Sequence, residues 1–537
     1  AWEDDVFTFE ETTVGEGSSM TRGYAVSAGG EAATVSEITI PSEYKGLPVV
    51  SISQKAFSGL SNLKVVNIPD SILSINYSRD GAFLNCSNLT AINFYESNMA
   101  QKGEYYSEDG VLFLKHVNQD SGDESSTVSL LMYPVNKAGD AYRVPDGVDI
   151  IVEDAFMESK VKEVTIPASV ASIGANAFMS CPNLVSVVIE DPADGEAVVT
   201  LTIAQRAFGS SKQLERVELP ARLTGISLTK YSLGNATSSG GAPSSQSIST
   251  NSTSAGIVDA FAGCTKLAEI VIADGNPVYS SDGGVIMMTT EESGKDITTI
   301  VYASANFAGE NGVYTVPAGV TRIANGAFVK CSKLTEVIIS NTVESIGEVA
   351  FYGCTGLKKV TFKGNGFVEN VTIGKYAFRG NAALESVVFE DACHVTEIGE
   401  GAFFDCTGLE SFTIPASMKT VGVQAFRASG LREVSFADGG GDLTFGTDVF
   451  YNCINLITFN LPANVTQLPS VFSGCVSLQY VNVDKGNQNY TSVDGVVYSK
   501  DISTLLFFPQ ARGGEILLAH QLVKISDGVL GRNSGLT

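Results

Sequence analysis

Residues 337–357, VIISNTVESIGEVAFYGCTGL, contain one complete unit of a pattern that recurs through the sequence. An apolar strand-like segment is followed by a small-residue turn and by Val-x-x-Ile-Gly. Ala-Phe comes next, with Cys three residues after the Phe and Leu three residues after the Cys. Self-similarity at a fixed spacing is the signature of a repeat architecture, in which stacked units bury a continuous core. The stretch therefore predicts a solenoid, and it says nothing about a ligand.

The Phe of this unit recurs along nearly the whole chain. The shortest spacings are 22 residues, from Phe156 to Phe178, and 23 residues, from Phe328 to Phe351. Leucine-rich repeats have periods of about 20 to 29 residues. About fourteen Phe-anchored coils are predicted, the last of them a degenerate copy at Val529-Leu530. The repeat Phe residues are Phe57, Phe83, Phe156, Phe178, Phe208, Phe261, Phe328, Phe351, Phe378, Phe403, Phe426, Phe450 and Phe472.

Each part of the unit predicts a local structure. Leu-x-x-Val-x-Ile, as in 334–339 and 409–414, alternates at period two and predicts a short strand. A following Pro, as in Ile414-Pro415, ends the strand because it lacks a donor for the next ladder bond. Val-x-x-Ile-Gly predicts a second extended piece and a glycine turn. Ala-Phe-x-x-Cys-x-x-Leu has apolar positions at spacings of three, which suits a single helical or 3₁₀ turn. A Phe in every coil indicates a core ladder in preference to a ligand platform.

The nine cysteines follow the repeat and do not form pairs. Eight of them occupy the position three residues after the repeat Phe, and Cys393 is the exception. Cys181 has Ser159 and Ser211 at this position in the coils on either side, so a disulfide framework is not expected. Paired spacings such as Cys-x-x-Cys, which zinc sites use, do not occur. The pattern predicts small buried thiols that fill one layer of the core.

The domain organisation follows from where the repeat is interrupted. Residues 1–55 alternate like half-buried strands and are expected to form an N-terminal β cap, because an open solenoid end exposes core and strand edges. Residues 56–537 form the predicted solenoid. Asp-Gly between apolar runs predicts inserted β-hairpins near 104–143, 278–315 and 488–515. The Ser/Thr/Gly tract 235–256 has one large apolar residue and is expected to be a flexible loop.

Composition excludes several partners. The chain has 59 acidic and 34 basic residues and a net charge of −25, which argues against nucleic acid and against an anionic membrane surface. No apolar run reaches the roughly 18 residues of a membrane helix. The start AWEDDVFTFE is acidic and unlike a signal peptide, and NSGLT stops inside a repeat, so we expect a mature or trimmed chain.

The combined pattern xIPxSVxxIGxxAFxxCxxLxxVxIP, seen in 163–178 and in 401–415 (GAFFDCTGLESFTIP), resembles the leucine-rich repeats of the BspA-like family. The hairpin unit Ser-x-Asp-Gly-Val-x-Tyr/Phe resembles them as well. The resemblance covers nearly the whole chain. It implies a mainly β, curved leucine-rich-repeat array with short helical or 3₁₀ turns and inserted β-hairpins. It also implies a secreted or cell-surface protein of the kind found in host-associated bacteria. Some of these proteins resemble adhesins. No site residue is carried over.

Residues with catalytic or metal-binding chemistry form no recognisable motif. His116, His394 and His520 lie in different coils without a patterned carboxylate or nucleophile, and we interpret each as solvated or locally bonded. Asp120, Asp123 and Glu124 lack the alternation of a calcium loop and are interpreted as a solvated acidic loop. Residues 439–442 (GGGD) lack the spacing of a dinucleotide loop and predict a turn. We therefore predict no enzyme, no catalytic or metal site and no cofactor.

Two functional hypotheses remain from different classes. The first is an extracellular, adhesin-like binding scaffold that engages host or matrix protein or glycoprotein through the solenoid surface, as a monomer. The second is a structural spacer that presents another module and has no ligand of its own. An exposed aromatic cluster on one face would favour the scaffold, and uniformly polar outward positions the spacer. Alternation alone makes outward-facing candidates of Thr165, Glu336, Lys359, Ser411 and Glu433.

Overall fold

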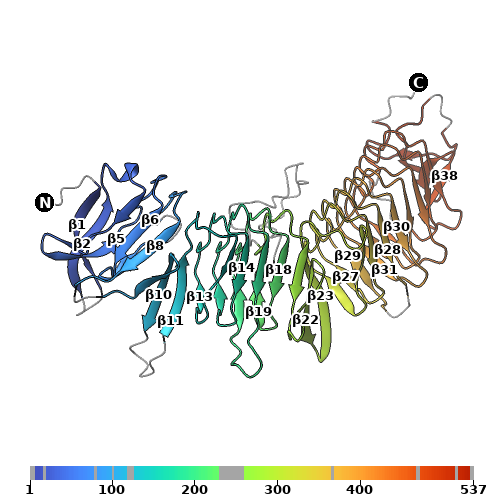
Figure 1. Ribbon diagram of the computed structural model, residues 1–537. Coiled ribbons are helices and arrows are strands. Elements are labelled where there is room, and N and C mark those ends of the chain that lie inside the picture. The colour runs from blue at the N-terminus through green and yellow to red at the C-terminus, as the bar shows by residue number, and fades with distance from the viewer. Residues whose placement is uncertain are drawn as a thin grey trace. The chain divides into compact units, whose positions relative to one another are not determined.

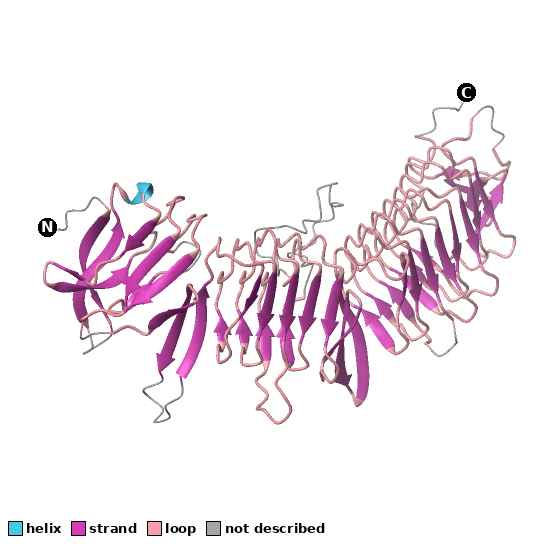
Figure 2. Cartoon of the chain, viewed as in Figure 1, coloured by secondary structure: helices cyan, strands magenta, loops and turns pink. Residues whose placement is uncertain are grey.

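The computed structural model describes residues 6–15, 20–77, 81–99, 102–117, 126–228, 259–364, 368–466, 472–513 and 518–531. The chain divides into two compact units, Ala1–Ser280 and Ser281–Thr537. Strands and turns make up almost all of the described chain (Figures 1 and 2), and its one helical element is the 3₁₀ helix η2 (Ala32–Thr34). The prediction of a mainly β repeat solenoid is confirmed. The predicted loop 235–256 and the acidic residues Asp120, Asp123 and Glu124 lie outside the described residues.

The first unit begins with a mixed sheet. β1 pairs antiparallel with β2, and β2 continues in parallel to β5 and from there to β7. The boundary between a cap and the solenoid near residue 55 stays a prediction. The strands of this part are β1 (Phe7–Val14), β2 (Thr21–Ala28), β3 (Glu37–Thr39), β4 (Glu43–Tyr44), β5 (Leu47–Ile52), β6 (Val65–Pro69), β7 (Ser74–Ile75) and β8 (Ala91–Tyr95).

The coils that follow in the first unit stack two rows of parallel strands. The long-strand row contains β12 (Ala141–Arg143), β14 (Glu163–Ile166), β16 (Ser186–Ile189), β18 (Arg216–Leu219) and β20 (Glu269–Ile272). The short-strand row extends the ribbon of β9 (Tyr105–Glu108), β10 (Val111–Val117) and β11 (Ser126–Met132) with β13 (Ile150–Ile151), β15 (Ser172–Ile173), β17 (Leu201–Ile203) and β19 (Leu223–Ile226). Strand β21 (Tyr279–Asp282) spans the boundary between the units.

The second unit repeats this arrangement. Its long-strand row is β24 (Val313–Thr315), β26 (Glu336–Ile339), β28 (Lys359–Phe362), β30 (Ser386–Phe389), β32 (Ser411–Ile414), β34 (Glu433–Phe436), β36 (Thr458–Leu461) and β37 (Tyr480–Val483). Its short-strand row joins the hairpin of β22 (Val285–Glu292) and β23 (Lys295–Ala303) to β25 (Val320–Ile323), β27 (Ser345–Ile346), β29 (Val371–Ile373), β31 (Val395–Ile398), β33 (Thr420–Val421) and β35 (Thr444–Phe445). A last sheet contains β38 (Tyr490–Val493), β39 (Val496–Ser499), β40 (Thr504–Phe507) and β41 (Lys524–Ile525).

The repeat Phe side chains form the predicted core ladder. In the second unit the rings of Phe351 and Phe378 lie 5.1 Å apart and nearly parallel, and those of Phe378 and Phe403 lie 5.3 Å apart. Each of these rings is fully buried. The backbone strengthens the stack, because the N–H of Phe378 donates to the carbonyl of Ala402 in the next coil at 2.8 Å. The ladder therefore joins side-chain stacking to coil-to-coil hydrogen bonding.

The segment around this Phe is a series of turns, and the prediction of a helical turn was only partly right. Cys331 N–H donates to the carbonyl of Phe328 at 3.1 Å, which is the i→i+3 bond of a β-turn. Lys330, between them, has a φ of 59°, in the left-handed region. A left-handed residue ends a right-handed helix. Residues before the Cys position in other coils, such as Ser180 and Asp405, have the same φ, so each turn remains isolated.

The cysteines are free thiols, as predicted, and the eight repeat cysteines are buried. The thiol of Cys354 donates to the carbonyl of Phe328 one coil earlier at 3.0 Å, and Cys181 does the same to Phe156 at 3.1 Å. Where Ser211 replaces the cysteine, its hydroxyl donates to the carbonyl of Phe178 at 2.7 Å. A small donor at this position therefore bonds to the preceding coil, which explains why Ser can replace Cys there; Leu60 and Asn381 are the exceptions.

Burial of these thiols predicts a loss of stability at alkaline pH. Burial raises the pKa of Cys181 and of Cys453 from 9.0 to about 11. As pH rises from about 9 to about 11, the unfolded chain releases thiol protons that the folded chain keeps, so the free energy of unfolding falls. The expected slope is about 1.4 kcal/mol per pH unit for each such thiol. Urea unfolding below and above pH 9 measures it, and Cys181→Ala should flatten the curve; an unchanged slope would contradict the prediction.

The predicted hairpins are present as antiparallel ribbons. β9 pairs with β10 across Asp109-Gly110, and β38 pairs with β39 across Asp494-Gly495. All four turn residues have positive φ, which is the geometry of a type I′ turn. In the remaining copy β22 pairs antiparallel with β23.

Candidate functional site: an opening in the long-strand row

The outward candidates predicted from alternation lie where expected. Glu336 and Lys359 occupy neighbouring outward positions on β26 and β28 and form an ion pair of 2.9 Å. Ser411 and Glu433 are paired across β32 and β34 and both are exposed. Thr165 lies on β14 of the first unit, between Arg143 and Val188. These strands present their outward residues in register, and whether any of them binds a ligand stays a prediction.

The outward face of the second unit is mainly polar. Its strands expose Ser, Thr, Asn, Glu and Lys, together with the aliphatic Val388. Tyr480 is the one exposed aromatic residue in the described strands of this row, with 42 % of its surface accessible. The row therefore has no exposed aromatic cluster.

The turn side of the second unit is filled by its own side chains. The guanidinium of Arg379 stacks on the ring of Phe404 at 4.4 Å, and Arg427 stacks on the same ring at 4.8 Å. Arg379 and Phe404 are both buried, and Arg427 continues the stack to Tyr451 at 5.0 Å. Cation–π contacts of this kind stabilise neighbouring coils. Because these contacts already occupy the aromatic and guanidinium groups of the turn side, the long-strand row is the better candidate for a binding surface.

The long-strand row of the second unit is interrupted at two places. Strands β24, β26, β28 and β30 form one ladder, β32 and β34 a second, and β36 and β37 a third. Between β30 and β32, and between β34 and β36, no strand ladder is formed. A cleft of about 730 Å³ lies at the first break and one of about 560 Å³ at the second. We refer to them as the β30/β32 opening and the β34/β36 opening.

A pair of Phe side chains lies beneath each opening. Phe389 of β30 and Phe412 of β32 meet edge to face at 5.8 Å, and Phe436 of β34 and Phe459 of β36 meet edge to face at 5.8 Å. The other strands of this row carry Val in place of Phe412 and Phe459, except β24, which carries Tyr314. Parallel strands lie about 4.8 Å apart, and an edge-on ring occupies more of that distance than a branched aliphatic side chain. We attribute both openings to these Phe pairs.

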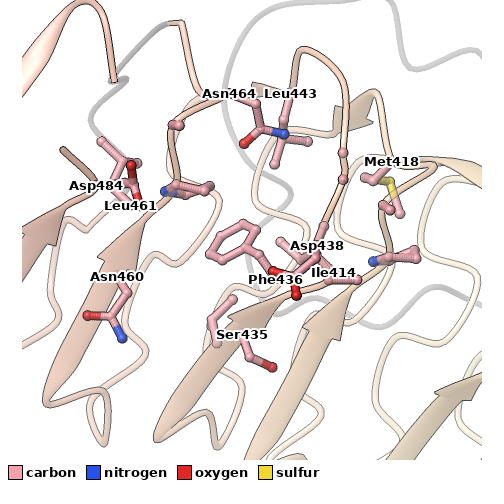
Figure 3. A pocket seen from close by; sticks show the side chains of 18 of the residues that line it. Ile414, Met418, Ser435, Phe436, Asp438, Leu443, Asn460, Leu461, Asn464 and Asp484 are labelled. Carbon is pink, nitrogen blue, oxygen red and sulfur yellow. The ribbon is translucent and has the colours of Figure 1, made fainter. Parts of the chain in front are cut away.

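The β34/β36 opening combines an apolar floor with a polar, acidic rim (Figure 3). Met418, Leu443 and Leu461 are buried beneath it, and Phe436 is half-buried. The exposed carboxylates are Glu433 at the start of β34, Asp438 after β34 and Asp484 after β37. None of the described residues that line the opening carries a positive charge.

The amide side chains of the rim partly bond to one another. Asn482 Nδ2 donates to Asn460 Oδ1 at 3.0 Å, and Asn464 Nδ2 donates to the carbonyl of Gly441. In Figure 3, Ser435 and Phe436 lie on one strand and Asn460 and Leu461 on the next. The rim therefore supplies amide and hydroxyl groups in addition to the carboxylates.

Main-chain groups of both strands face the β34/β36 opening. Successive residues of a parallel strand direct their N–H and C=O groups alternately to its two neighbours. The N–H of Ala437 donates to Ile414 in β32, so the main-chain groups of Val434 and Phe436 point the other way, into the opening. On β36 the main-chain groups of Thr458 and Asn460 face it, because Leu461 pairs with β37. The opening therefore has a free strand edge on each side.

The β30/β32 opening is lined by Cys393, the cysteine outside the repeat position, and by His394. Burial raises the pKa of Cys393 to about 11, so its thiol is neutral at physiological pH and unsuited to act as a nucleophile. Glu390 at this opening forms an ion pair with Lys363 at 2.6 Å. Of the other histidines, His116 contacts Glu104 at 3.0 Å and His520 is exposed. The described residues contain no cluster of metal-ligating side chains.

No sequence pattern described above points to the residues of the β34/β36 opening. Residues 439–442 predict a turn, and Asp438-Gly439 does form one, with a φ of 82° at Gly439. That turn also forms part of the rim. The signal that could have located the opening is a Phe at the fourth strand position followed, one coil later, by a Phe at the second strand position.

Comparison with known proteins gives one family. The family described as "BspA type Leucine rich repeat region (6 copies)" matches residues 31–109, 140–237, 199–280, 310–431 and 371–499. These segments cover most of the chain. Among proteins of curated function none matches.

Several solved structures are similar. A leucine-rich repeat protein from Bacteroides ovatus is 22 % identical, with a TM-score of 0.54 over 89 % of this chain and 98 % of that one. A leucine rich cell surface protein from Faecalibacterium prausnitzii is 19 % identical, with a TM-score of 0.40 over 88 % of this chain and 95 % of that one. The pneumococcal vaccine antigen PcpA is 16 % identical, with a TM-score of 0.37 over 99 % of this chain and 96 % of that one. The first of these supports the fold assignment.

Across the described ranges, no helix has the length and apolar character needed to cross a membrane.

Proposed function

The chain belongs to the BspA-type leucine-rich repeat family, and we propose that it is an extracellular or cell-surface protein-binding scaffold with an adhesin-like role. Its partner is a host or matrix protein or glycoprotein, bound by a single chain through the outward face of the long-strand row in the second unit. The resemblance of its repeats to those of exported members of this family supports the surface location. Residues 1–55 act as a cap, which protects the first strands of the array from edge-to-edge association.

The observation that carries this proposal is the broken strand row. Solenoids bind partners along a continuous face of stacked strands. In this chain the face is interrupted by two openings whose walls retain free strand edges, above an apolar floor. Concave sites with a few directed polar groups are the usual ligand sites of proteins.

A second candidate function is that of a structural spacer. The polar character of the outward face, where Tyr480 is the exposed aromatic residue, favours it. A spacer needs a soluble outer surface and no recognition site. It does not account for the openings, which cost ladder hydrogen bonds.

Binding of the purified chain to immobilised matrix and mucosal glycoproteins at physiological salt tests the proposal. A matched pair of variants locates the surface, because Thr413 on β32 and Thr420 on β33 are both exposed and belong to the same coil. Thr413→Arg should weaken saturable binding by about tenfold or more, whereas Thr420→Arg on the short-strand row should leave it unchanged. Equal effects of the two variants, or no saturable binding to any of the glycoproteins, would overturn the proposal in favour of the spacer.

A further inference from the structure

We propose that the outer edge of β1 binds an extended segment of a partner protein, which adds to this edge as a further strand and in which basic and apolar residues alternate. The site lies in the first unit (Figure 1) and is separate from the face of the second unit that the glycoprotein partner occupies. The inference therefore goes beyond the proposed function and does not depend on it.

The main-chain groups of every second residue of β1 are free. In an antiparallel pair, residues that exchange both main-chain bonds with the partner strand alternate with residues whose groups point away from it. The N–H of Gly29 donates to the carbonyl of Val6 at 2.7 Å, in the register of β1 and β2, so the even-numbered residues of β1 bond to β2. The residues whose groups point to the outer edge are Phe7, Phe9, Glu11 and Thr13. Within the described ranges, no main-chain or side-chain group bonds to that edge.

The next strand confirms this alternation. Ala28 of β2 precedes Gly29, so its main-chain groups point away from β1. Its N–H donates to the carbonyl of Ala56 at 2.7 Å, on the β5 side. The direction of the main-chain groups of β1 is therefore fixed from both sides of β2.

The length of β1 distinguishes it from the other end strands of the described sheets. β1 has eight residues in continuous register with β2, whereas none of the other end strands exceeds the five residues of β8. β1 contains no proline, and its pairing with β2 contains no bulge. Short strands, prolines and bulges are features that protect a sheet edge from pairing. The cap that covers the first coil therefore has an unprotected edge of its own.

The inner face of β1 favours apolar side chains in the added strand. Side chains of paired residues on neighbouring strands lie next to each other on the same face of the sheet. Phe7 and Phe9 are half-buried on the inner face, and Phe9 stacks on Tyr44 at 4.1 Å. Apolar side chains beside these rings would remove more of their surface from water, which is favourable.

The outer face of β1 favours a basic side chain. Glu10 is exposed on this face and forms no ion pair with any described residue, whereas Glu11 is already paired with Arg22 at 2.8 Å. Opposite charges on neighbouring strands stabilise the pairing. An added strand with Lys or Arg beside Glu10 therefore supplies the missing cation, and its alternate residues meet the apolar inner face.

The same charges disfavour a second copy of this chain as the occupant. Antiparallel pairing of two β1 strands through their free groups requires odd-numbered residues opposite odd-numbered residues. The two registers that pair most of β1 place Glu10 opposite Glu10, or Glu11 opposite Glu11. Like charges directly opposite one another destabilise a strand pair, and the net charge of −25 adds to the repulsion.

The probe is a fluorescent hexapeptide of alternating Lys and Val with blocked ends, and fluorescence anisotropy with the full chain measures its binding. We expect saturable binding that weakens as salt is raised. A control peptide of alternating Glu and Val should bind at least about tenfold more weakly. Equal binding of the two peptides would overturn the proposal.

Two methylated peptides separate strand addition from charge attraction. Strand addition uses every second N–H of the peptide. One Lys/Val peptide is methylated on the main-chain nitrogens of its Lys residues and the other on those of its Val residues. One of them should bind about tenfold or more weakly than the parent peptide, and the other nearly as well as the parent. If both bound equally, the edge would not be the site.

A matched pair of variants at Glu11 locates the edge. Both lose the ion pair with Arg22, which is exposed and contributes little to stability. Glu11→Thr keeps the outward N–H, whereas Glu11→Pro removes it. Because the fold does not use this N–H, an edge strand tolerates proline there. Glu11→Pro should bind the Lys/Val peptide about tenfold or more weakly than Glu11→Thr does, and equal binding by the two variants would overturn the proposal.

Glu10→Lys tests the charge without changing the main chain. The variant should bind the Glu/Val peptide better than the Lys/Val peptide, which reverses the preference of the unmodified chain. A preserved preference for Lys would contradict the proposal whether or not Glu11→Pro folds. Dimers of the unmodified chain that light scattering detects, and that Glu11→Pro abolishes, would assign the edge to a second copy and overturn it as well.

Discussion

Phe378→Ala is expected to lower the free energy of unfolding by about 3–5 kcal/mol. The ring of Phe378 is fully buried and stacks on Phe351 and Phe403 in the coils before and after it. Truncation removes the transfer free energy of the ring and leaves a cavity that stacked backbones can only partly close. Because the backbone bond from Phe378 to Ala402 fixes the coil spacing, collapse around the missing ring is limited.

Urea unfolding followed by far-ultraviolet circular dichroism measures the effect. Val423→Ala is the control, because Val423 is a partly exposed apolar residue near the same ladder, and its loss should cost no more than about 0.5 kcal/mol. If the two variants were equally stable, the Phe ladder would not be the main stabilising element of the second unit.

Gly399→Ala is expected to cost about 3 kcal/mol through overpacking. This glycine ends the Ile-Gly pair of its coil, and a Cβ there would lie 2.7 Å from the carbonyl carbon of Gly374 and 2.8 Å from the nitrogen of Lys375. Both atoms belong to the backbone of the preceding coil, so neither can move aside as a flexible side chain would. The N–H of Gly399 also donates to the carbonyl of Ile373 at 2.7 Å, which holds the two coils at this spacing.

The control for this substitution is Gly441→Ala, where an added Cβ meets nothing within 4 Å and φ is not in the left-handed region. It should change the free energy of unfolding by less than about 0.5 kcal/mol. Thermal unfolding of both variants compares them directly. If Gly399→Ala were tolerated, neighbouring coils could separate at low cost, and the prediction would be wrong. The close approach recurs from coil to coil, at Gly347, Gly374, Gly399, Gly422 and Gly446.

The position of these glycines in the repeat can be predicted from the sequence, but the physical reason for glycine there cannot. The repeat places Gly after Ile in many coils, and a glycine turn was the natural interpretation. The structure shows that the requirement at Gly374 and Gly399 is the close approach of the neighbouring coil. Close approach depends on how two coils stack, and no single unit contains that information.

The same distinction applies to the turn segment. Apolar residues at spacings of three favour a helical turn, and the i→i+3 bonds do form. Left-handed residues such as Lys330 and Asp405 interrupt them. Non-glycine residues adopt this conformation at a cost, which bonds to the next coil offset. Lys330 N–H, for example, donates to the carbonyl of Tyr352 at 2.8 Å.

Periodicity was sufficient to predict the solenoid, the Phe ladder and the free buried thiols, and local turn residues were sufficient to predict the hairpins at Asp109-Gly110 and Asp494-Gly495. Each of these depends on residues that are close in sequence or that repeat at a constant interval, so the pattern of one repeat predicts the structure of the others. The two openings are different, because they depend on Phe389 against Phe412 and on Phe436 against Phe459, in successive coils. A strand row is joined or broken by the space that two facing side chains need. That space exists only once the coils are stacked, which is why the rim of Asp438, Asn460 and Asp484 emerged from the three-dimensional arrangement.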